Sequence, residues 1–182
     1  EADVIEINNF SFVHKYDCLD GLKENGIVLI NSIFAPKEIG KVLPKKYCQV
    51  LKDKHAKLFV INAQKIANEC GLGEKINIIM MSALFKGAKL LSQNEICENI
   101  SRYIHSMFSQ KGQEVVEKNL KAMKMGLEIN EVQVQTLEGK DYRVENITDD
   151  QFYTNIMQKI SKMKGGEIPV SQFNEDGSSP LG

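Results

Sequence analysis

The run Ile27-Val28-Leu29-Ile30-Asn31 is the stretch that decides the fold. Continuous apolar runs of this length, rich in β-branched residues, are typical of strands covered on both faces. Two further runs of this kind, Val4–Ile7 and Leu58–Asn62, precede and follow it in the chain. Helical segments separate the three runs, and a crossover connection calls for parallel pairing. The sequence therefore predicts an α/β fold: a parallel sheet with helices on both faces, in the strand order of a doubly wound fold.

The connections between these strands carry helix signals. Lys15–Glu24 has apolar residues at three-residue spacing, and Asn25-Gly26 follows as a stop signal. After the second strand, Pro36 marks the start of one short helix, and Pro44 separates it from a second helix over Lys45–His55. Both connections are therefore predicted to be helical crossovers.

The middle of the chain reads as a helical half. A helix over Ala63–Cys70 ends at Gly71-Leu72-Gly73. Ile76–Leu91 is apolar almost all round but too short for a membrane span, which predicts a helix buried between the sheet and other helices. Ser92-Gln93-Asn94-Glu95 is a capping box that opens the next helix, and Gly112 starts another.

The character changes again after residue 130. Residues 131–145 alternate with a period of two around Glu138-Gly139, which predicts a hairpin. Residues 148–151 form a second capping box, and the helix after it ends at Gly165-Gly166. The remaining residues are rich in Pro, Gly, Ser and Asp, as in an extended tail. We divide the chain into an α/β domain over 1–130, a hairpin-plus-helix extension over 131–166, and a linker over 167–182.

Composition is that of a soluble globular protein. Of 182 residues, 42% are hydrophobic and 26% are charged, which excludes disorder as the main state. The net charge is −1, and Arg102 and Arg143 are the only arginines, whereas arginine is the preferred residue for reading phosphates and bases. We therefore expect neither a nucleic acid nor a membrane as partner.

The cysteines predict free thiols. Cys18, Cys48, Cys70 and Cys97 lie far apart and form no CxxC element, so the sequence supports no zinc or iron–sulfur site. Free thiols fit a reducing compartment, and no signal peptide is visible, so we expect a cytoplasmic protein. The chain enters its first strand almost at once, which predicts a section cut from a longer protein.

No set of side chains forms a recognisable catalytic pattern. His14, His55 and His105 stand beside no nucleophile motif, and ordinary structural histidines explain them. The acidic pair Asp17 and Asp20 lies at the start of the helix predicted over Lys15–Glu24, where carboxylates complement the helix dipole. We therefore predict no catalytic residue and no metal ligand.

Two turns have the composition of a binding loop. Asn8–Phe12 follows the first strand, and Gly71–Asn77 joins two helices. Glycines let a backbone approach a phosphate, and a helix start offers free N–H groups, although the same glycines are typical of a helix stop. Two classes stay open: an accessory domain with a cofactor-facing loop in a larger enzyme, and a non-catalytic α/β binding or interaction module. Strands that lead into such turns favour the first.

Several stretches, in this order, resemble segments of the pyruvate:ferredoxin (flavodoxin) oxidoreductases. In that family they read "KYDVLEGLK" and "GGxFLLNS", "FYxIDAxKIA", "GLGNRINMIM" and "LPVSAF". The matching stretches are Lys15–Lys23, Gly26–Ser32, Phe59–Ala67, Gly71–Met80 and Ile168–Phe173. The resemblance implies the gamma-type domain of that enzyme, an incomplete Rossmann-like unit without its glycine-rich first strand, turn and helix.

The resemblance also implies an activity for the full-length enzyme. The family uses thiamine diphosphate, Mg²⁺ and [4Fe–4S] clusters to decarboxylate pyruvate oxidatively to acetyl-coenzyme A and carbon dioxide. Electrons pass to ferredoxin or flavodoxin, or to NADP in a protist form fused to an FAD- and FMN-containing reductase module. The expected partners are the remaining domains of the same polypeptide and a second copy in a homodimer. The fused form would place the enzyme in a mitochondrion-related organelle, and the isolated chain is expected to bind no cofactor and to be inactive.

The resemblance further implies that this domain faces coenzyme A. The expected residues are Gly71, Gly73, Lys75 and Asn77, with Asn9 in the first turn as a weaker candidate. Glycines allow close backbone approach, Lys75 offers an ammonium group, and Asn77 offers an amide near a helix start. The chain departs from the family pattern because Glu74 stands in place of an asparagine.

Overall fold

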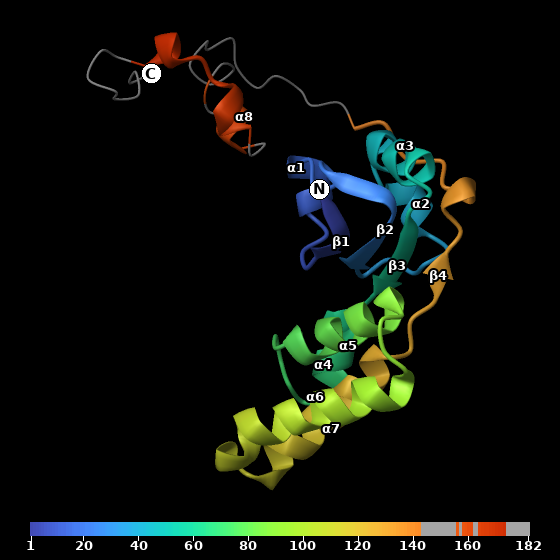
Figure 1. Cartoon of the computed structure of the whole chain (residues 1–182), viewed down its shortest axis with the longest axis vertical. Coiled ribbons are helices and arrows are strands. Elements are labelled where there is room, and N and C mark those ends of the chain that lie inside the picture. Colours follow the sequence, from blue (N-terminus) through green and yellow to red (C-terminus); the bar gives the residue numbers. More distant parts are fainter. Residues whose placement is uncertain (143–155, 157, 162–163, 174–182) are drawn as a thin grey trace.

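The computed structural model describes residues 1–142, 156, 158–161 and 164–173 (Figure 1). A four-stranded sheet has the order β1-β2-β3-β4. The strands are β1 (Ala2–Ile7), β2 (Leu22–Asn31), β3 (Lys57–Ile61) and β4 (Glu131–Val132). β1, β2 and β3 pair in parallel, whereas β4 pairs antiparallel with β3. The three predicted parallel strands are therefore confirmed.

Helices cover both faces of the sheet. The longer described helices are α1 (Phe12–Lys15), α2 (Ile39–Val42), α3 (Lys45–Asp53), α4 (Ala63–Glu69), α5 (Asn77–Ala88), α6 (Gln93–Phe108) and α7 (Gln113–Gly126). Because successive side chains of a strand point to opposite faces, Val28 and Ile30 pack toward α2 and α3, whereas Leu29 and Phe59 pack toward α4, α5 and α7. This agrees with the predicted fold class.

The order of the three parallel strands is that of one half of a doubly wound sheet, as predicted. The strands follow one another in chain order, and buried residues of both crossover connections, such as Val13 and Leu51, belong to the same core on one face of the sheet. One half of a doubly wound sheet has its strands in chain order in this way, and the switch point that would join it to a second half does not occur among the described strands. The opposite face is covered by helices that follow β3.

α6 forms an outer layer on α5 and α7. Ile96, Ile100 and Ile104 of α6 are buried in a third apolar cluster with residues of both helices. The predicted capping box is confirmed: the Ser92 hydroxyl accepts from the Glu95 backbone N–H, and the Glu95 carboxylate accepts from the Ser92 N–H. No helix within the described residues has the length and apolar character needed to cross a membrane.

The helix predicted over Lys15–Glu24 is wrong. α1 ends at Lys15, a turn follows, and β2 begins at Leu22. Gly21 adopts a left-handed backbone with φ of 77°, which ends the turn, and Leu22 then pairs with Ala2 of β1. The three-residue spacing of apolar residues arises because the turn buries Leu19 in the core without being helical.

The hairpin predicted over 131–145 is also wrong within the described residues. We call residues 131–142 the strap. Its first two residues pair with β3, Val134–Thr136 form a short 3-10 helix, and the Gly139 N–H donates to the carbonyl of Gly40 at 2.8 Å. The first residues of the alternating segment pair with the edge of β3, and they form no hairpin with a second strand inside the strap.

The structure describes only parts of the C-terminal segment to which the remaining predictions apply. The second capping box at 148–151 lies outside the described residues. Of the helix expected after it, the structure describes α8 (Gln158–Ser161). Short 3-10 helices follow at Gly165–Glu167 and Val170–Gln172, and residues 174–182 of the predicted tail again lie outside the described residues.

Candidate functional site

A hollow of about 350 Å³ lies at the carboxyl ends of the three parallel strands. Open α/β sheets bind ligands at this edge because the loops that follow the strands converge there. Each parallel strand contributes the residues that directly follow it, and Gln64 and Ile76 complete the wall. The lining residues are Asn8, Asn9 and Phe10 after β1, Asn31 at the end of β2 with Ser32, Ile33 and Phe34 after it, and Asn62 after β3.

Asn31, the last residue of β2, joins all three strand ends. Its Nδ2 group donates to the carbonyl oxygen of Asn8 at 2.9 Å, and its Oδ1 accepts from the backbone N–H of Ala63 at 3.0 Å. One side chain thereby ties the turn after β1 to the first residue of α4. These bonds fix the spacing of the loops that line the hollow.

The neighbouring polar side chains cap local backbone. Asn62 is the N-cap of α4, and its Oδ1 accepts from the N–H of Lys65 at 2.9 Å. Asn9 Oδ1 accepts from the N–H of Ser11 at 3.0 Å. Ser32, which is 3% exposed, accepts through its hydroxyl from the N–H of Phe34 at 3.1 Å. The oxygen ends of these side chains are therefore already engaged by the fold.

The glycine turn after α4 is a complete helix cap. Gly71 has φ of 68°, its N–H donates to the Asn68 carbonyl at 3.0 Å, and the Leu72 N–H donates to the Ala67 carbonyl at 2.8 Å. This pair of bonds is the Schellman motif, in which a left-handed residue ends a helix. The end of the helix therefore explains the positive φ of Gly71, in agreement with the interpretation of this glycine as a helix stop. Gly73 also has a positive φ, of 61°, but a Cβ added there would meet nothing within 4 Å.

The turn borders the hollow at one point. Ile76 lines the hollow, and Gln64, another lining residue, donates from Nε2 to the carbonyl of Gly73 at 2.9 Å. Lys75 is exposed, and Asn77 is the exposed first residue of α5, whose N-cap provides no capping side chain. The residues beside the hollow thus include the start of a helix with free N–H groups.

The structure brings only part of the predicted site together. Asn9 lines the hollow, whereas Gly71, Gly73, Lys75 and Asn77 are not among its lining residues. A Cβ added to Gly71 would lie 3.3 Å from Cε of Lys118 on α7, so this glycine faces another helix.

The wall of the hollow carries amides, one hydroxyl and apolar groups, and none of its lining side chains is charged. Glu6 of β1, two residues before Asn8, has a shifted pKa. Partial burial raises the pKa of this carboxyl above its usual range, and a hydrogen bond with Asn8 opposes that rise. The hollow is therefore suited to hydrogen bonding and to apolar contact.

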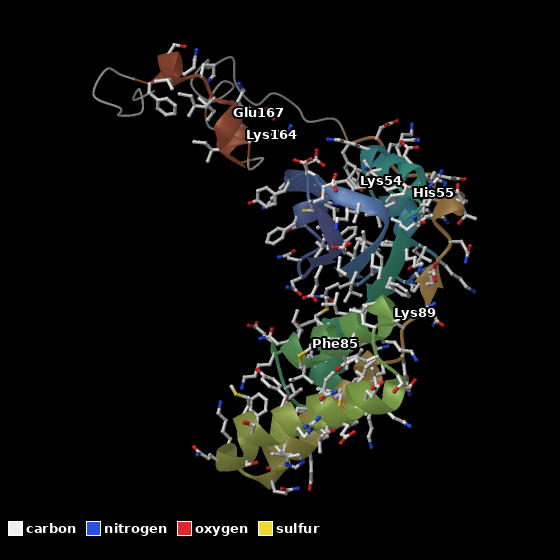
Figure 2. All side chains as sticks on the ribbon, viewed as in Figure 1. Lys54, His55, Phe85, Lys89, Lys164 and Glu167 are labelled. Atoms are coloured by element: carbon white, nitrogen blue, oxygen red, sulfur yellow. The ribbon has the colours of Figure 1, made fainter. Side chains whose placement is uncertain are left out.

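The histidines lie outside this hollow. His14 packs edge-on against Phe10, with ring centroids 5.4 Å apart, and partial burial lowers its pKa. His55 follows α3 (Figure 2) and its Nδ1 lies 2.6 Å from an oxygen of Glu24. The carbonyl of His105 accepts a hydrogen bond from the Ser109 hydroxyl within the last turn of α6. None of the three lies beside a nucleophile in the contacts described.

The cysteines are free thiols among the described residues. Cys48 and Cys70 are buried, and burial raises the pKa of both thiols, which disfavours the reactive thiolate. Within residues 1–142 and the shorter described segments, no three His, Cys, Asp or Glu side chains gather as metal ligands would. The described residues therefore supply no complete ligand set for a metal ion or cluster.

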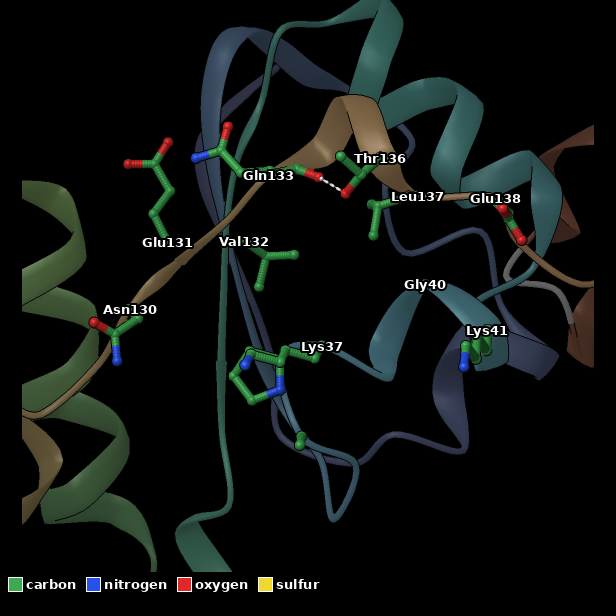
Figure 3. A pocket seen from close by; sticks show the side chains of 12 residues that line it. Lys37, Gly40, Lys41, Asn130, Glu131, Val132, Gln133, Thr136, Leu137 and Glu138 are labelled. Atoms are coloured by element: carbon green, nitrogen blue, oxygen red, sulfur yellow. Dashed lines mark hydrogen bonds between the residues drawn. The ribbon is translucent and has the colours of Figure 1, made fainter.

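A second, larger hollow of about 710 Å³ lies between the strap and the segment around α2 (Figure 3). Lys37, Gly40 and Lys41 line one side, and Glu131 and Glu138 belong to the strap on the other. None of the predicted site residues lines it. It lies at the β4 edge of the sheet, and its lining residues Ala35 and Pro36 directly follow the loop residues after β2 that line the first hollow.

Sequence reasoning missed Asn31, Ser32, Asn62 and Gln64. The signal that could have found them is simple: a polar residue directly after an apolar strand run lies at the carboxyl edge of a parallel sheet. Asn31 and Asn62 each occupy this position in the sequence. The sequence favoured the 71–77 turn instead, because a pair of glycines is a more distinctive pattern than a single amide side chain.

Comparisons with known proteins agree on one family. A family model described as pyruvate ferredoxin/flavodoxin oxidoreductase matches residues 1–129, and a second, described as a domain of unknown function, matches residues 139–182. The chain is 33% identical to the pyruvate:ferredoxin oxidoreductase of Moorella thermoacetica and 30% identical to the pyruvate-flavodoxin oxidoreductase of Klebsiella pneumoniae. Both matches cover 100% of this chain but 16% of the relative, so the chain spans about a sixth of the curated relatives it matches.

A solved structure matches the fold. The pyruvate oxidoreductase subunit PORC from Thermotoga maritima superposes with a TM-score of 0.54, at 24% sequence identity. The match covers 72% of this chain and 65% of that subunit. At this level of identity the similarity supports the fold alone.

Proposed function

Since the chain belongs to the pyruvate ferredoxin/flavodoxin oxidoreductase family, we propose that it is one section of an enzyme that oxidatively decarboxylates pyruvate to acetyl-coenzyme A and carbon dioxide. The observation that carries this proposal is the family match over residues 1–129, continued by similarity along the whole chain. The electron acceptor in this proposal is ferredoxin, flavodoxin or NADP. The enzyme would act in the cytoplasm, as a homodimer.

The redox and decarboxylation chemistry would come from other sections of the polypeptide. Thiamine diphosphate with Mg²⁺ supplies a nucleophilic carbon for decarboxylation, and [4Fe–4S] clusters carry single electrons. The described residues hold no group of three metal-ligating side chains, so they do not fit a cluster by themselves. We therefore assign this section a structural and substrate-facing role, and expect the isolated chain to be inactive with pyruvate. The division into a domain over 1–130, an extension over 131–166 and a linker toward an iron–sulfur domain over 167–182 belongs to this proposal.

The substrate-facing role concerns coenzyme A. The proposed contacts are the backbone at Gly71 and Gly73, the Lys75 ammonium, and the amides of Asn77 and Asn9. Three observations support it: the space around Gly73 is open, Lys75 is exposed, and no side chain caps the start of α5 at Asn77. Free helix N–H groups and a nearby lysine suit a phosphate.

Replacement of Asn77 in the full-length enzyme tests this role. Asn77→Ala removes one hydrogen bond to a charged group, worth ~1.5–3 kcal/mol, so the KM for coenzyme A should rise about tenfold to about a hundredfold. The KM for pyruvate should stay within about twofold, since pyruvate binds elsewhere in this proposal. An unchanged KM for coenzyme A with a lowered melting temperature would mean that Asn77 only starts a helix.

A further inference from the structure

The fold fixes the orientation of three side-chain amides at the strand ends. Backbone N–H groups already engage the Oδ1 atoms of Asn9, Asn31 and Asn62, at 3.0, 3.0 and 2.9 Å. These bonds fix which end of each amide points away from the backbone, because an amide turned around would place its NH₂ group against an N–H. The NH₂ ends are therefore the ends available to a ligand.

Two of these NH₂ groups have no protein partner within the part of the chain that the structure describes. Asn31 uses its Nδ2 group on the carbonyl of Asn8, whereas the Nδ2 groups of Asn9 and Asn62 form no hydrogen bond with a described residue. Both side chains line the same hollow, one from the turn after β1 and one from the end of β3. We call Asn9, Asn31 and Asn62 the amide row.

The chemistry of the wall selects the kind of acceptor. Phosphate sites use cationic side chains, and no lysine or arginine lines this hollow. Phe10, Phe34 and Ile76 supply apolar surface between the polar groups. A ligand that suits this wall is an uncharged chain that alternates carbonyl oxygens with methylene groups.

We propose that the amide row binds the pantetheine arm of coenzyme A through its amide carbonyl oxygens, while the phosphorylated nucleotide lies toward Lys75. This inference rests on the proposed function and adds to it that different residues of one site bind the neutral arm and the phosphorylated nucleotide. Asn9 and Asn62 donate to the neutral arm. Asn31 acts as a positioning residue, because it holds the turn that carries Asn9 against the helix that Asn62 caps.

An isosteric substitution separates recognition from folding at these positions. Asn62→Asp and Asn9→Asp keep an oxygen that accepts the same backbone N–H, since aspartate is as good a cap as asparagine, but they remove the NH₂ donor. Asn62→Ser keeps an N-cap oxygen without adding charge. Asn94→Asp, at an exposed position in the first turn of α6, is the matched control for the added negative charge.

The experiment measures inhibition of the full-length enzyme by two halves of the substrate, competing against coenzyme A. The halves are S-methyl pantetheine, which cannot accept an acetyl group, and adenosine 3′,5′-bisphosphate. Asn62→Asp and Asn62→Ser should raise the inhibition constant of S-methyl pantetheine about tenfold and change that of the bisphosphate less than about twofold, because the lost donor served the neutral arm. Lys75→Met should do the reverse, and Asn94→Asp should change neither.

Two results would overturn the inference. One is an unchanged S-methyl pantetheine constant in both Asn62 variants, provided that the variants melt within a few degrees of wild type. The other is a larger effect of Asn62→Ser on the bisphosphate. If Lys75→Met still raises the KM for coenzyme A in those cases, the proposed function stands and only the division of labour fails. If neither Lys75 nor Asn62 affects coenzyme A, both fail.

Discussion

The side-chain amide of Asn31 donates a hydrogen bond to the backbone carbonyl oxygen of Asn8, 2.9 Å away, and so links the carboxyl ends of two neighbouring parallel strands. The ladder of β1 with β2 has its last partner pair at Ile7 and Ile30, one residue before each of these. The side chain therefore continues strand pairing beyond the point where the backbones separate. This hydrogen bond holds together two loops at an edge of the sheet where loops are usually more mobile than the strands.

Asn31→Ala should destabilise the fold through this edge. The substitution removes the donor to Asn8 and leaves the N–H of Ala63, a fully buried residue, without its acceptor. We expect a loss of ~2 kcal/mol in the free energy of unfolding, measured by urea denaturation of the 182-residue chain. Asn94→Ala, which removes an exposed asparagine on α6, should stay within about 0.5 kcal/mol of wild type. Equal stability of the two variants would show that the Asn31 bonds contribute nothing net.

Gly126→Ala should disrupt the contact between α7 and α5. A Cβ at this position would lie 2.7 Å from the backbone oxygen of Ile79 and 3.0 Å from Cβ of Ser82. Backbone cannot move aside as a flexible side chain can, so the helices must separate at a cost of ~1–3 kcal/mol. The matched control is Gly165→Ala, because a Cβ there meets nothing within 4 Å. Thermal denaturation of both variants makes the comparison, and a Gly126 variant as stable as the Gly165 variant would contradict the tight packing.

Ser92→Ala should weaken α6 in a way that depends on pH. Loss of an N-cap serine costs ~1 kcal/mol. The hydrogen bonds from Ser92 also lower the pKa of Glu95, the carboxylate that completes the capping box. A group whose pKa is lower in the folded state adds stability above its unfolded pKa and loses that contribution as the pH falls through its folded pKa.

The stability difference between wild type and Ser92→Ala should therefore be largest near neutral pH and should shrink as the pH falls below about 4. Urea denaturation at about pH 7 and at about pH 3 measures both values. A difference that grows on acidification would show that the Glu95 carboxylate does not take part in the cap.

The parallel sheet could be predicted because each strand is indicated by a continuous run of apolar residues in the sequence. Ile27–Asn31 and Leu58–Asn62 were predicted as strands because they are apolar runs; the first lies in β2, and the second lies in β3 up to Ile61. The capping box at Ser92 succeeded for the same reason, since all its atoms belong to four consecutive residues. Such signals need no knowledge of the rest of the chain.

The failures involve partners that are distant in sequence. Lys15–Glu24 has a helical spacing, but Leu22 pairs with Ala2 and starts a strand. The strap has the alternation of a hairpin, but Val132 pairs with Leu58, a residue far away in the chain. In both cases tertiary pairing overrode a local pattern.

The lining of the hollow could be predicted only in part, for a related reason. Asn9 was found because it follows a strand, and it lines the hollow. Gly71 was chosen for its glycine pattern, and its backbone geometry is explained by the Schellman motif at the end of α4. Which polar side chains converge depends on the register of three strands, and no local pattern contains that register.

The antiparallel pairing of β4 with β3 sets an order of events during synthesis. β1, β2 and β3 are neighbours in the chain as well as in the sheet, so the connections that their pairing closes are shorter than the connection between β3 and β4. β4 emerges from the ribosome after α4 to α7, and until then the edge of β3 offers unpaired backbone groups to any other strand nearby. If the three parallel strands pair as soon as they are synthesised, one sheet edge stays open until β4 pairs with β3 and covers it.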